Sequence, residues 1–166
     1  MFMESVILNN TQIKHKIKRM AYQIYEANFD SKTIVLAGIA HNGFILAKKL
    51  NAILNEISPL KIVLCEVKID KVNPLKPITT SLEAEMYENT SLVLVDDVLN
   101  SGTTLMYAVK LFLEVPLKQF KTAVLVDRNH KKYPVKADYK GISLSTSLQE
   151  HVQVSFKNNS AKAFLQ

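Results

Sequence analysis

The sequence has one cysteine, no tryptophan, few arginines and no long apolar run. Because Cys65 is the single cysteine, no disulfide can form within the chain, and this fits a reducing compartment. The apolar stretches are far shorter than the roughly 20 residues of a membrane-spanning helix. The first residues lack a basic segment followed by an apolar one, which argues against a secretory signal. We therefore expect a cytoplasmic protein with no membrane association.

Several catalytic signatures are also missing from the sequence. There is no His-Glu-x-x-His motif and no Cys-x-x-Cys pair, so a zinc centre is not expected. There is no Gly-x-Ser-x-Gly elbow of a hydrolase and no Gly-x-Gly-x-x-Gly fingerprint of a dinucleotide site. The loop over residues 38–43 has glycines at Walker A spacing, but Phe44 and Ile45 replace the required Lys and Ser/Thr. A nucleotide-triphosphatase P-loop is therefore excluded.

The charge of the chain is basic and comes mostly from lysine. Lys and Arg total 21 against 15 Asp and Glu, which gives a formal net charge of +6, and only Arg19 and Arg128 are arginines. Such a balance fits nucleic acid or phosphorylated small ligands as partners, and it also fits an ordinary lysine-rich surface. A length of 166 residues without repeats or a Pro/Gly/Ser-rich linker predicts a single domain over residues 1–166.

The first helical pattern covers residues 11–28, and Thr11 is the expected N-cap. One face of this helix is apolar and the other is crowded with cations. The basic residues are Lys14, His15, Lys16, Lys18 and Arg19. This face is either an RNA or phosphate surface or simply a solvated helix face.

The remaining pattern alternates strands with helices. Apolar runs predict buried strands over residues 33–38, 61–69, 92–95 and 120–126, and alternation over 152–156 predicts a strand that closes a sheet edge. Residues 70–86 contain prolines and threonines with little periodicity, so we expect a loop or long hairpin arm there. This order predicts an α/β fold with a mostly parallel central sheet and helices on both faces.

The most informative stretch follows the strand over residues 92–95. Asp96 and Asp97 come first, then a small polar turn over residues 100–104, and then a helix that begins near Thr103. The unpaired N–H groups and the dipole at a helix start favour an anion, and Gly102 allows a close backbone approach. Carboxylates repel phosphate, so the two acids more plausibly face sugar hydroxyls or a metal. The stretch therefore predicts a site for a sugar phosphate with a free diol.

Residues 95–104 resemble the phosphoribosyl-pyrophosphate (PRPP) motif of type I phosphoribosyltransferases. The resemblance implies that Asp96 and Asp97 are the catalytic acids that hold the ribose hydroxyls, with Mg²⁺ bound through them and the substrate. It implies a small hood beside the central sheet. It also implies a 5′-phosphate loop made of Asn100, Ser101, Gly102, Thr103 and Thr104.

The resemblance also implies a pyrophosphate loop after the first strand, made of Ala40, His41, Asn42 and Gly43. The loop departs from the family because it lacks the basic residue that is often found there, and a polar loop of no function is an alternative for His41. In the family a mobile loop over residues 70–86 closes on the reacting centre. Three lysines in or next to this stretch could meet pyrophosphate, and the sequence does not choose between them: Lys68, Lys71 and Lys76.

A narrower resemblance covers residues 6–154 and is clearest over 95–104 and 125–141. It is to the bifunctional pyrimidine-operon attenuators that also have uracil phosphoribosyltransferase activity. It implies a hood over about residues 128–150 plus the N-terminal segment. In this hood Arg128, Pro134 and Val135 would lie next to the nucleobase. Arg128 either meets a phosphate or the base, or forms a surface ion pair with Asp127 or Asp138. A lone loop histidine such as His130 is more often a surface group.

The function that the resemblance implies is transfer of a phosphoribosyl group from PRPP to a free base, with uracil preferred and pyrophosphate released. Three alternatives remain: an RNA-binding regulator of a pyrimidine operon that senses nucleotide in the same pocket, a purine phosphoribosyltransferase, and a catalytically silent nucleotide binder. The resemblance further implies a homodimer or a higher homo-oligomer.

Overall fold

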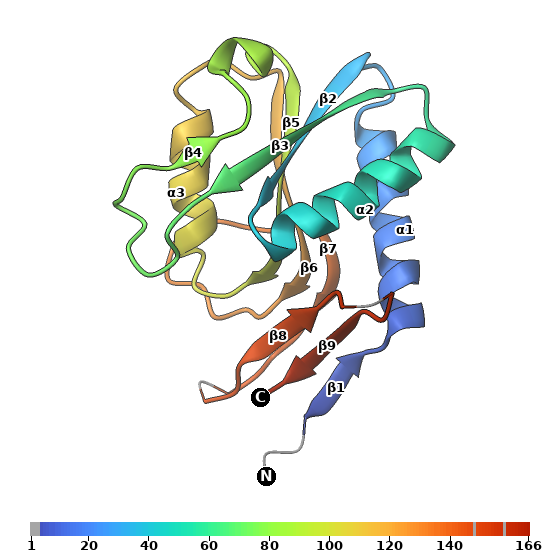
Figure 1. The fold of residues 1–166 in the computed structure, drawn as a ribbon, viewed down its shortest axis with the longest axis vertical. Helices are drawn as coiled ribbons and strands as arrows, with labels where there is room; N and C mark the ends of the chain where they lie inside the picture. The colour runs from blue at the N-terminus through green and yellow to red at the C-terminus, as the bar shows by residue number, and fades with distance from the viewer. Residues whose placement is uncertain (1–3, 148, 158) are drawn as a thin grey trace.

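The computed structural model of the 166-residue chain describes residues 4–147, 149–157 and 159–166. The strands of its main sheet are β2 (Thr33–Ile39), β3 (Lys61–Lys68), β4 (Thr79–Thr80), β5 (Ser91–Leu99), β6 (Gln119–Asp127) and β7 (Tyr139–Ser143). Their order is β4-β3-β2-β5-β6-β7, as Figure 1 shows. All neighbours pair in parallel except β4, which is antiparallel to β3 at the edge.

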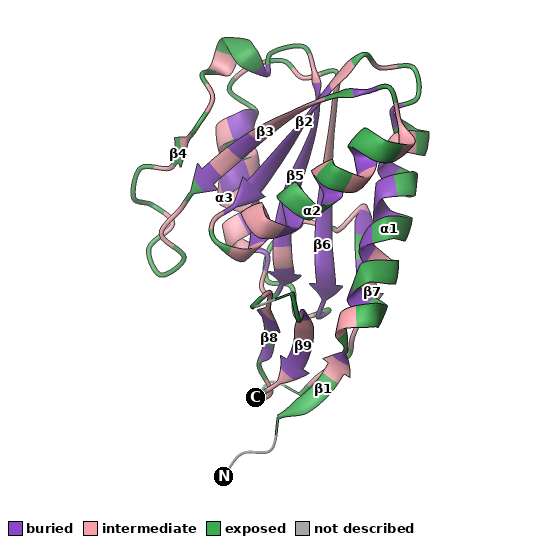
Figure 2. Ribbon diagram, turned by 45° about the vertical axis from the view of Figure 1, so that its right-hand side comes forward, coloured by how far each residue is buried: buried purple, intermediate pink, exposed green. Residues whose placement is uncertain are grey.

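Helices cover both faces of the main sheet. The helices are α1 (Asn10–Ala27), α2 (Asn42–Ile57) and α3 (Thr103–Phe112), with a 3-10 turn η1 at Ala84–Met86. The apolar sides of α1 and α2 pack on one face of the sheet, and α3 packs on the other (Figures 1 and 2). Burial on both faces explains why β2, β5 and β6 are continuous apolar runs rather than alternating ones. The predicted α/β architecture is thus confirmed.

A second sheet has three antiparallel strands, β1 (Ser5–Leu8), β8 (Val152–Ser155) and β9 (Lys162–Leu165), in the order β1-β9-β8. We call it the small sheet, and it lies beyond the carboxyl ends of β5 and β6 in Figure 1. The strand expected over residues 152–156 is present and forms an edge of this sheet.

The small sheet differs from the hood expected over residues 128–150 plus the N-terminal segment. The N-terminal segment does take part, since β1 pairs with β9. However, β7 lies within the expected range and belongs to the main sheet, where it pairs in parallel with β6 and buries Tyr139 and Gly141. The other strands of the small sheet come from residues 152–165 instead.

The start of α1 differs from the prediction. The N-cap is Asn9 rather than Thr11, and its side-chain oxygen accepts a hydrogen bond from the backbone N–H of Gln12 at 2.9 Å. The Gln12 side chain accepts from the Asn9 N–H in return, also at 2.9 Å. This reciprocal capping box satisfies two helix-terminal donors, which a cap at Thr11 would not.

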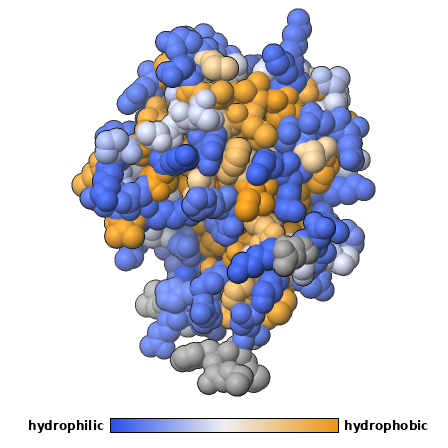
Figure 3. All heavy atoms as spheres, viewed as in Figure 1, coloured by the Kyte–Doolittle hydropathy of each residue, from blue (hydrophilic) through white to orange (hydrophobic). Residues whose placement is uncertain are grey.

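The stretch over residues 70–86 contains only β4 and η1 as regular elements, as its weak periodicity predicted. In the part of the chain that the structure describes, no helix has the length and apolarity needed to cross a bilayer. Figure 3 shows hydrophilic atoms over much of one face, with apolar atoms gathered towards its upper half. Half-buried apolar residues of β3, such as Ile62 and Leu64, reach the surface.

Candidate active site

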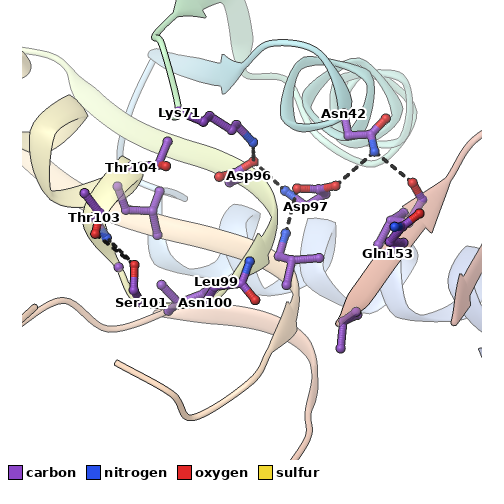
Figure 4. A pocket seen from close by; sticks show the side chains of 15 residues that line it. Asn42, Lys71, Asp96, Asp97, Leu99, Asn100, Ser101, Thr103, Thr104 and Gln153 are labelled. Carbon is purple, nitrogen blue, oxygen red and sulfur yellow. Dashed lines mark hydrogen bonds and ion pairs between the residues drawn. The ribbon is translucent and has the colours of Figure 1, made fainter. Parts of the chain in front are cut away.

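A cavity of about 340 Å³ lies at the carboxyl end of β5. Its longest wall runs from Asp96, in the second half of β5, to Leu105 in the first turn of α3. Asn42 at the start of α2, Lys71 in the loop after β3, and residues 152–154 of β8 complete it (Figure 4). Ligands bind at this edge in open α/β sheets, where strand ends and helix starts meet.

The two adjacent acids on this wall have different surroundings. Asp96 is only 3% exposed, and its Oδ1 accepts a hydrogen bond from the Asp97 N–H at 2.9 Å and lies 3.6 Å from Nζ of Lys71. Burial raises the pKa of Asp96 to about 7, although the Lys71 ammonium acts in the opposite direction. Asp97 is half-buried, and its Oδ1 accepts from the Val98 N–H at 2.8 Å.

The loop over residues 100–104 is shaped for close approach of a ligand to its backbone. Gly102 has φ +88°, a left-handed conformation that favours glycine, and α3 begins at the next residue as predicted. A hydrogen bond of 2.8 Å joins the hydroxyls of Ser101 and Thr103. Gly102 provides no capping side chain, and the Thr103 N–H makes only a long hydrogen bond to Oγ of Ser101, at 3.3 Å, so this helix start is suited to an anion.

The segment after β6 supports this loop from behind. The backbone N–H groups of Lys132 and Tyr133 donate to the Ser101 carbonyl at 2.7 and 3.1 Å. A Cβ placed on Gly102 would lie 2.5 Å from Cγ1 of Val135. Val135 therefore packs under the loop over residues 100–104, and neither it nor Pro134 lines the cavity.

The expected pyrophosphate loop reaches the cavity through Asn42 alone among Ala40, His41, Asn42 and Gly43. The peptide bond between Ala40 and His41 is cis. Gly43 lets the first turn of α2 pass close to β5, because a Cβ there would lie 2.6 Å from the Val95 carbonyl oxygen. The loop therefore brings Asn42 next to the acids.

The structure distinguishes between the three lysines that the sequence left open. Lys71 lines the cavity, and it is the only cationic side chain on the wall within the described residues. Lys76 instead pairs with Asp70 at 2.7 Å outside the cavity. Lys68 lies at the end of β3, beside Thr79 of β4 and away from the acids.

Arg128 is not on the cavity wall and is only 6% exposed. Its guanidinium donates to Oδ1 of Asn100 at 3.0 Å and to Oγ1 of Thr146 at 2.9 Å. It also donates to the backbone carbonyls of Ser147 and Glu150. Arg128 thus joins the loop over residues 100–104 to the segment that leads to β8, and it does not form the surface ion pair that was the alternative.

The two aspartates offered as partners of Arg128 have other cations near them. Asp127 lies 3.4 Å from Nζ of Lys131 and 3.9 Å from that of Lys140, and Asp138 lies 3.4 Å from Nζ of Lys136.

Sequence reasoning did not find the wall that β8 forms. It consists of Val152, Gln153 and Val154, and Figure 4 shows β8 across the cavity from the loop over residues 100–104. The alternation of this segment predicted a strand, but nothing in it indicated that the strand borders a ligand site.

Comparison with known proteins agrees with this geometry. The model of the phosphoribosyl transferase domain family matches residues 4–158. The chain belongs to this family, and its fold is that of a type I phosphoribosyltransferase. It is similar to the "Bifunctional protein PyrR" of Haemophilus ducreyi, at 32% identity over 92% of this chain and 89% of that protein. The Clostridium acetobutylicum protein of the same name is 32% identical over 95% and 93%.

Two solved structures with the same fold are purine phosphoribosyltransferases. The hypoxanthine phosphoribosyltransferase of Trypanosoma cruzi has a TM-score of 0.78 at 16% identity, over 96% of this chain and 95% of that one. A hypoxanthine-guanine phosphoribosyltransferase of Bacillus anthracis has a TM-score of 0.75 at 17% identity, over 99% of both chains. At such identities the likeness concerns the fold and not the base.

Proposed function

We propose that this phosphoribosyltransferase joins uracil to the ribosyl carbon of PRPP and releases pyrophosphate. In this reaction the bond from that carbon to a pyrophosphate oxygen breaks, a bond to a uracil nitrogen forms, and the nitrogen loses its proton to solvent. The observation that carries the proposal is one cavity with two carboxylates on one side and an anion-binding helix start on the other. The similarity to bifunctional PyrR proteins supports a pyrimidine as the base.

Each part of the cavity then has a separate task. Asp96 and Asp97 accept hydrogen bonds from the ribose hydroxyls, and the loop over residues 100–104 holds the 5′-phosphate. Lys71 neutralises part of the charge on pyrophosphate as a point charge rather than a bidentate fork. The β8 wall faces the base, which its backbone can bind through N–H and C=O groups. Positioning of two reactants and stabilisation of charge provide most of the acceleration.

Magnesium fits this arrangement only together with the substrate. Within the described residues no group of three or more His, Cys, Asp or Glu side chains gathers. Mg²⁺ is usually bound by one or two carboxylates, waters and substrate phosphates, and Asp96 and Asp97 are suited to that share. When bound, the ion would neutralise the pyrophosphate leaving group. Because PRPP is a highly charged metabolite kept inside cells, we also propose that the chain works in the cytoplasm.

The test is an assay of the purified chain with PRPP, Mg²⁺ and a panel of pyrimidine and purine bases. We expect turnover with uracil, and we expect it to disappear in the Asp96→Asn/Asp97→Asn double variant. Asp30→Asn is the matched control, because Asp30 is an exposed acid that pairs with Lys118 far from the cavity. Turnover of a purine alone would identify a purine enzyme, and PRPP binding without any turnover would identify a silent binder.

A second function, RNA-binding regulation, is supported by the surface of α1. Lys14, His15, Lys18 and Arg19 are all exposed, although Arg19 also donates to the carbonyls of Lys140 and Gly141. The word bifunctional in the names of the relatives agrees with a second role. A homo-oligomer, which we also propose, would bring several such faces together.

RNA binding is tested by measuring the affinity for a hairpin and for its scrambled sequence across a range of salt concentrations. A regulator should prefer the hairpin, and Lys14→Gln with Lys18→Gln should weaken binding and reduce its salt dependence. Equal affinity for both RNAs would indicate only general charge attraction. Light scattering of the same sample measures the oligomeric state.

A further inference from the structure

The side chain of Asn42 connects two parts of the cavity that are far apart in the sequence. Its amide nitrogen donates to Oδ2 of Asp97 at 2.9 Å and to the backbone carbonyl of Val154 in β8 at 2.8 Å, as Figure 4 shows. An amide nitrogen carries two hydrogens, so both are used in these contacts. The nitrogen of Asn42 therefore has no hydrogen left for pyrophosphate in this arrangement.

We infer that Asn42 is a positioning residue that fixes Asp97 and the β8 wall relative to each other. Asp97 receives one hydrogen bond on each carboxylate oxygen, from the Val98 N–H on Oδ1 and from Asn42 on Oδ2. Two donors on opposite oxygens determine the plane of the carboxylate. The lone pairs that remain are then held in place as acceptors for the ribose hydroxyls.

The contact with Val154 fixes the opposite wall. β8 is an edge strand of the small sheet and pairs only with β9 among the described strands. An edge strand presents backbone groups that its sheet does not satisfy. The carbonyl of Val154 is such a group, and it finds its donor in Asn42 rather than in another strand. This hydrogen bond attaches the β8 wall of the small sheet to the start of α2, next to Asp97.

Both contacts depend on a rigid support and on the chemistry of an amide. Asn42 is the first residue of α2, and the close packing of Gly43 on Val95 keeps this helix start against β5. An aspartate at position 42 would have the same shape but no donor, and its charge would repel Asp97. An alanine would leave the Val154 carbonyl and one oxygen of Asp97 without this donor.

This inference rests on the proposed function in one respect, that Asp97 holds the ribose diol. The experiment measures the binding of uridine 5′-monophosphate and of its 2′,3′-dideoxy analogue to the wild type, Asn42→Ala and Asn42→Asp. In the wild type the diol should strengthen binding. In Asn42→Ala this advantage of the diol should shrink about tenfold, and in Asn42→Asp it should shrink further. Asn55→Ala, an exposed position on the same helix, should leave it unchanged.

If Asn42 only supported the fold, its replacement would weaken the binding of both ligands by the same factor, and this result would overturn the inference. Unchanged binding of both ligands would overturn it as well. Amide hydrogen exchange without ligand gives a second, independent measurement. We expect exchange over residues 152–155 to become faster in Asn42→Ala than in the wild type or Asn55→Ala. If the wild type binds neither ligand, the proposed function fails, and the role of Asn42 is judged from hydrogen exchange alone. Equal exchange over residues 152–155 in Asn42→Ala and the wild type would reject that role.

Discussion

The ammonium of Lys71 lies 3.6 Å from the buried carboxylate of Asp96, and both side chains line the cavity (Figure 4). Lys71 comes from the irregular loop after β3, whereas Asp96 belongs to the central strand of the sheet. The lysine side chain is about half exposed, so this ion pair contributes little to stability. Under the proposed function its role is instead to offer a positive charge to the leaving pyrophosphate.

Replacing Lys71 by methionine should therefore impair binding of PRPP more than folding. We expect KM for PRPP to rise roughly tenfold, because one favourable charge contact to pyrophosphate is lost. Loss of the ammonium should also raise the pKa of Asp96 further, since Lys71 lowers it. Steady-state kinetics over a range of pH values measure both effects.

Lys76→Met is the control for this variant, because Lys76 belongs to the same loop but pairs with Asp70 outside the cavity. It should leave KM for PRPP within about twofold of the wild type. Equal effects of the two substitutions would mean that the loop contributes only its general charge.

The burial of Asp96 predicts how stability depends on pH in the protein without ligand. Its pKa is raised from 3.8 to about 7, mainly by burial. Between these values the folded protein keeps a proton that the unfolded chain releases, so this carboxyl lowers the free energy of unfolding as pH rises through the window. The side chain in Asp96→Asn cannot ionise, so the variant does not share this loss. The free energy of unfolding of the variant minus that of the wild type should therefore increase from pH 4 to pH 7, by roughly 4 kcal/mol at most.

Urea unfolding of both proteins at pH 4.5 and pH 7.5 tests this expectation. The quantity to compare is the difference in free energy of unfolding between variant and wild type at each pH. A difference that is constant with pH would show that Asp96 is ionised in the folded protein at both values, and that solvent or Lys71 compensates for its burial.

The sequence predicted the parts of the molecule whose signals are local. The turn at Gly102 and the helix from Thr103 are where they were expected, and the buried strand is present but longer than predicted, since it continues through both acids to Leu99. The parallel sheet followed from the alternation of apolar strands with amphipathic helices. These features depend on neighbouring residues, so a single sequence is sufficient to find them.

The remaining parts depend on contacts between distant segments. Lys71, Gln153 and Asp96 meet only because the loop after β3, β8 and β5 converge at one edge of the sheet. No spacing in the sequence records this convergence. The N-cap of α1 could not be predicted for a related reason. Asn9 and Thr11 are both suitable capping residues, and only the reciprocal contact of Asn9 with Gln12 decides between them.

Gly43 provides a test of how closely α2 must approach the acids. In Gly43→Ala the new methyl group would lie 2.6 Å from the carbonyl oxygen of Val95 and 3.1 Å from Oδ1 of Asp96. We expect a loss of about 1–3 kcal/mol in stability and a larger relative loss of turnover, because the helix start must move away from Asp96. Thermal unfolding and kcat are the measurements, and full activity would show that the helix start yields without disturbing the site.

Arg128 provides the last prediction, which separates support of the phosphate loop from contact with the base. In Arg128→Met the partly buried hydrogen bonds from the guanidinium to Asn100 and Thr146 are lost, so stability should fall by about 1–3 kcal/mol. Arg128→Lys should recover only part of this loss, because one ammonium cannot replace a planar group that reaches both partners. Lys136→Met, which removes a nearby exposed cation that pairs with Asp138, should have little effect.

Binding of ribose 5-phosphate and of uridine 5′-monophosphate distinguishes the two roles of Arg128. If the guanidinium holds the phosphate loop through Asn100, both ligands should weaken by the same factor in Arg128→Met, since both carry the 5′-phosphate. If it contacts the base instead, only the uridine nucleotide should weaken. Because Arg128 lies off the cavity wall and donates to Asn100, we expect the first result.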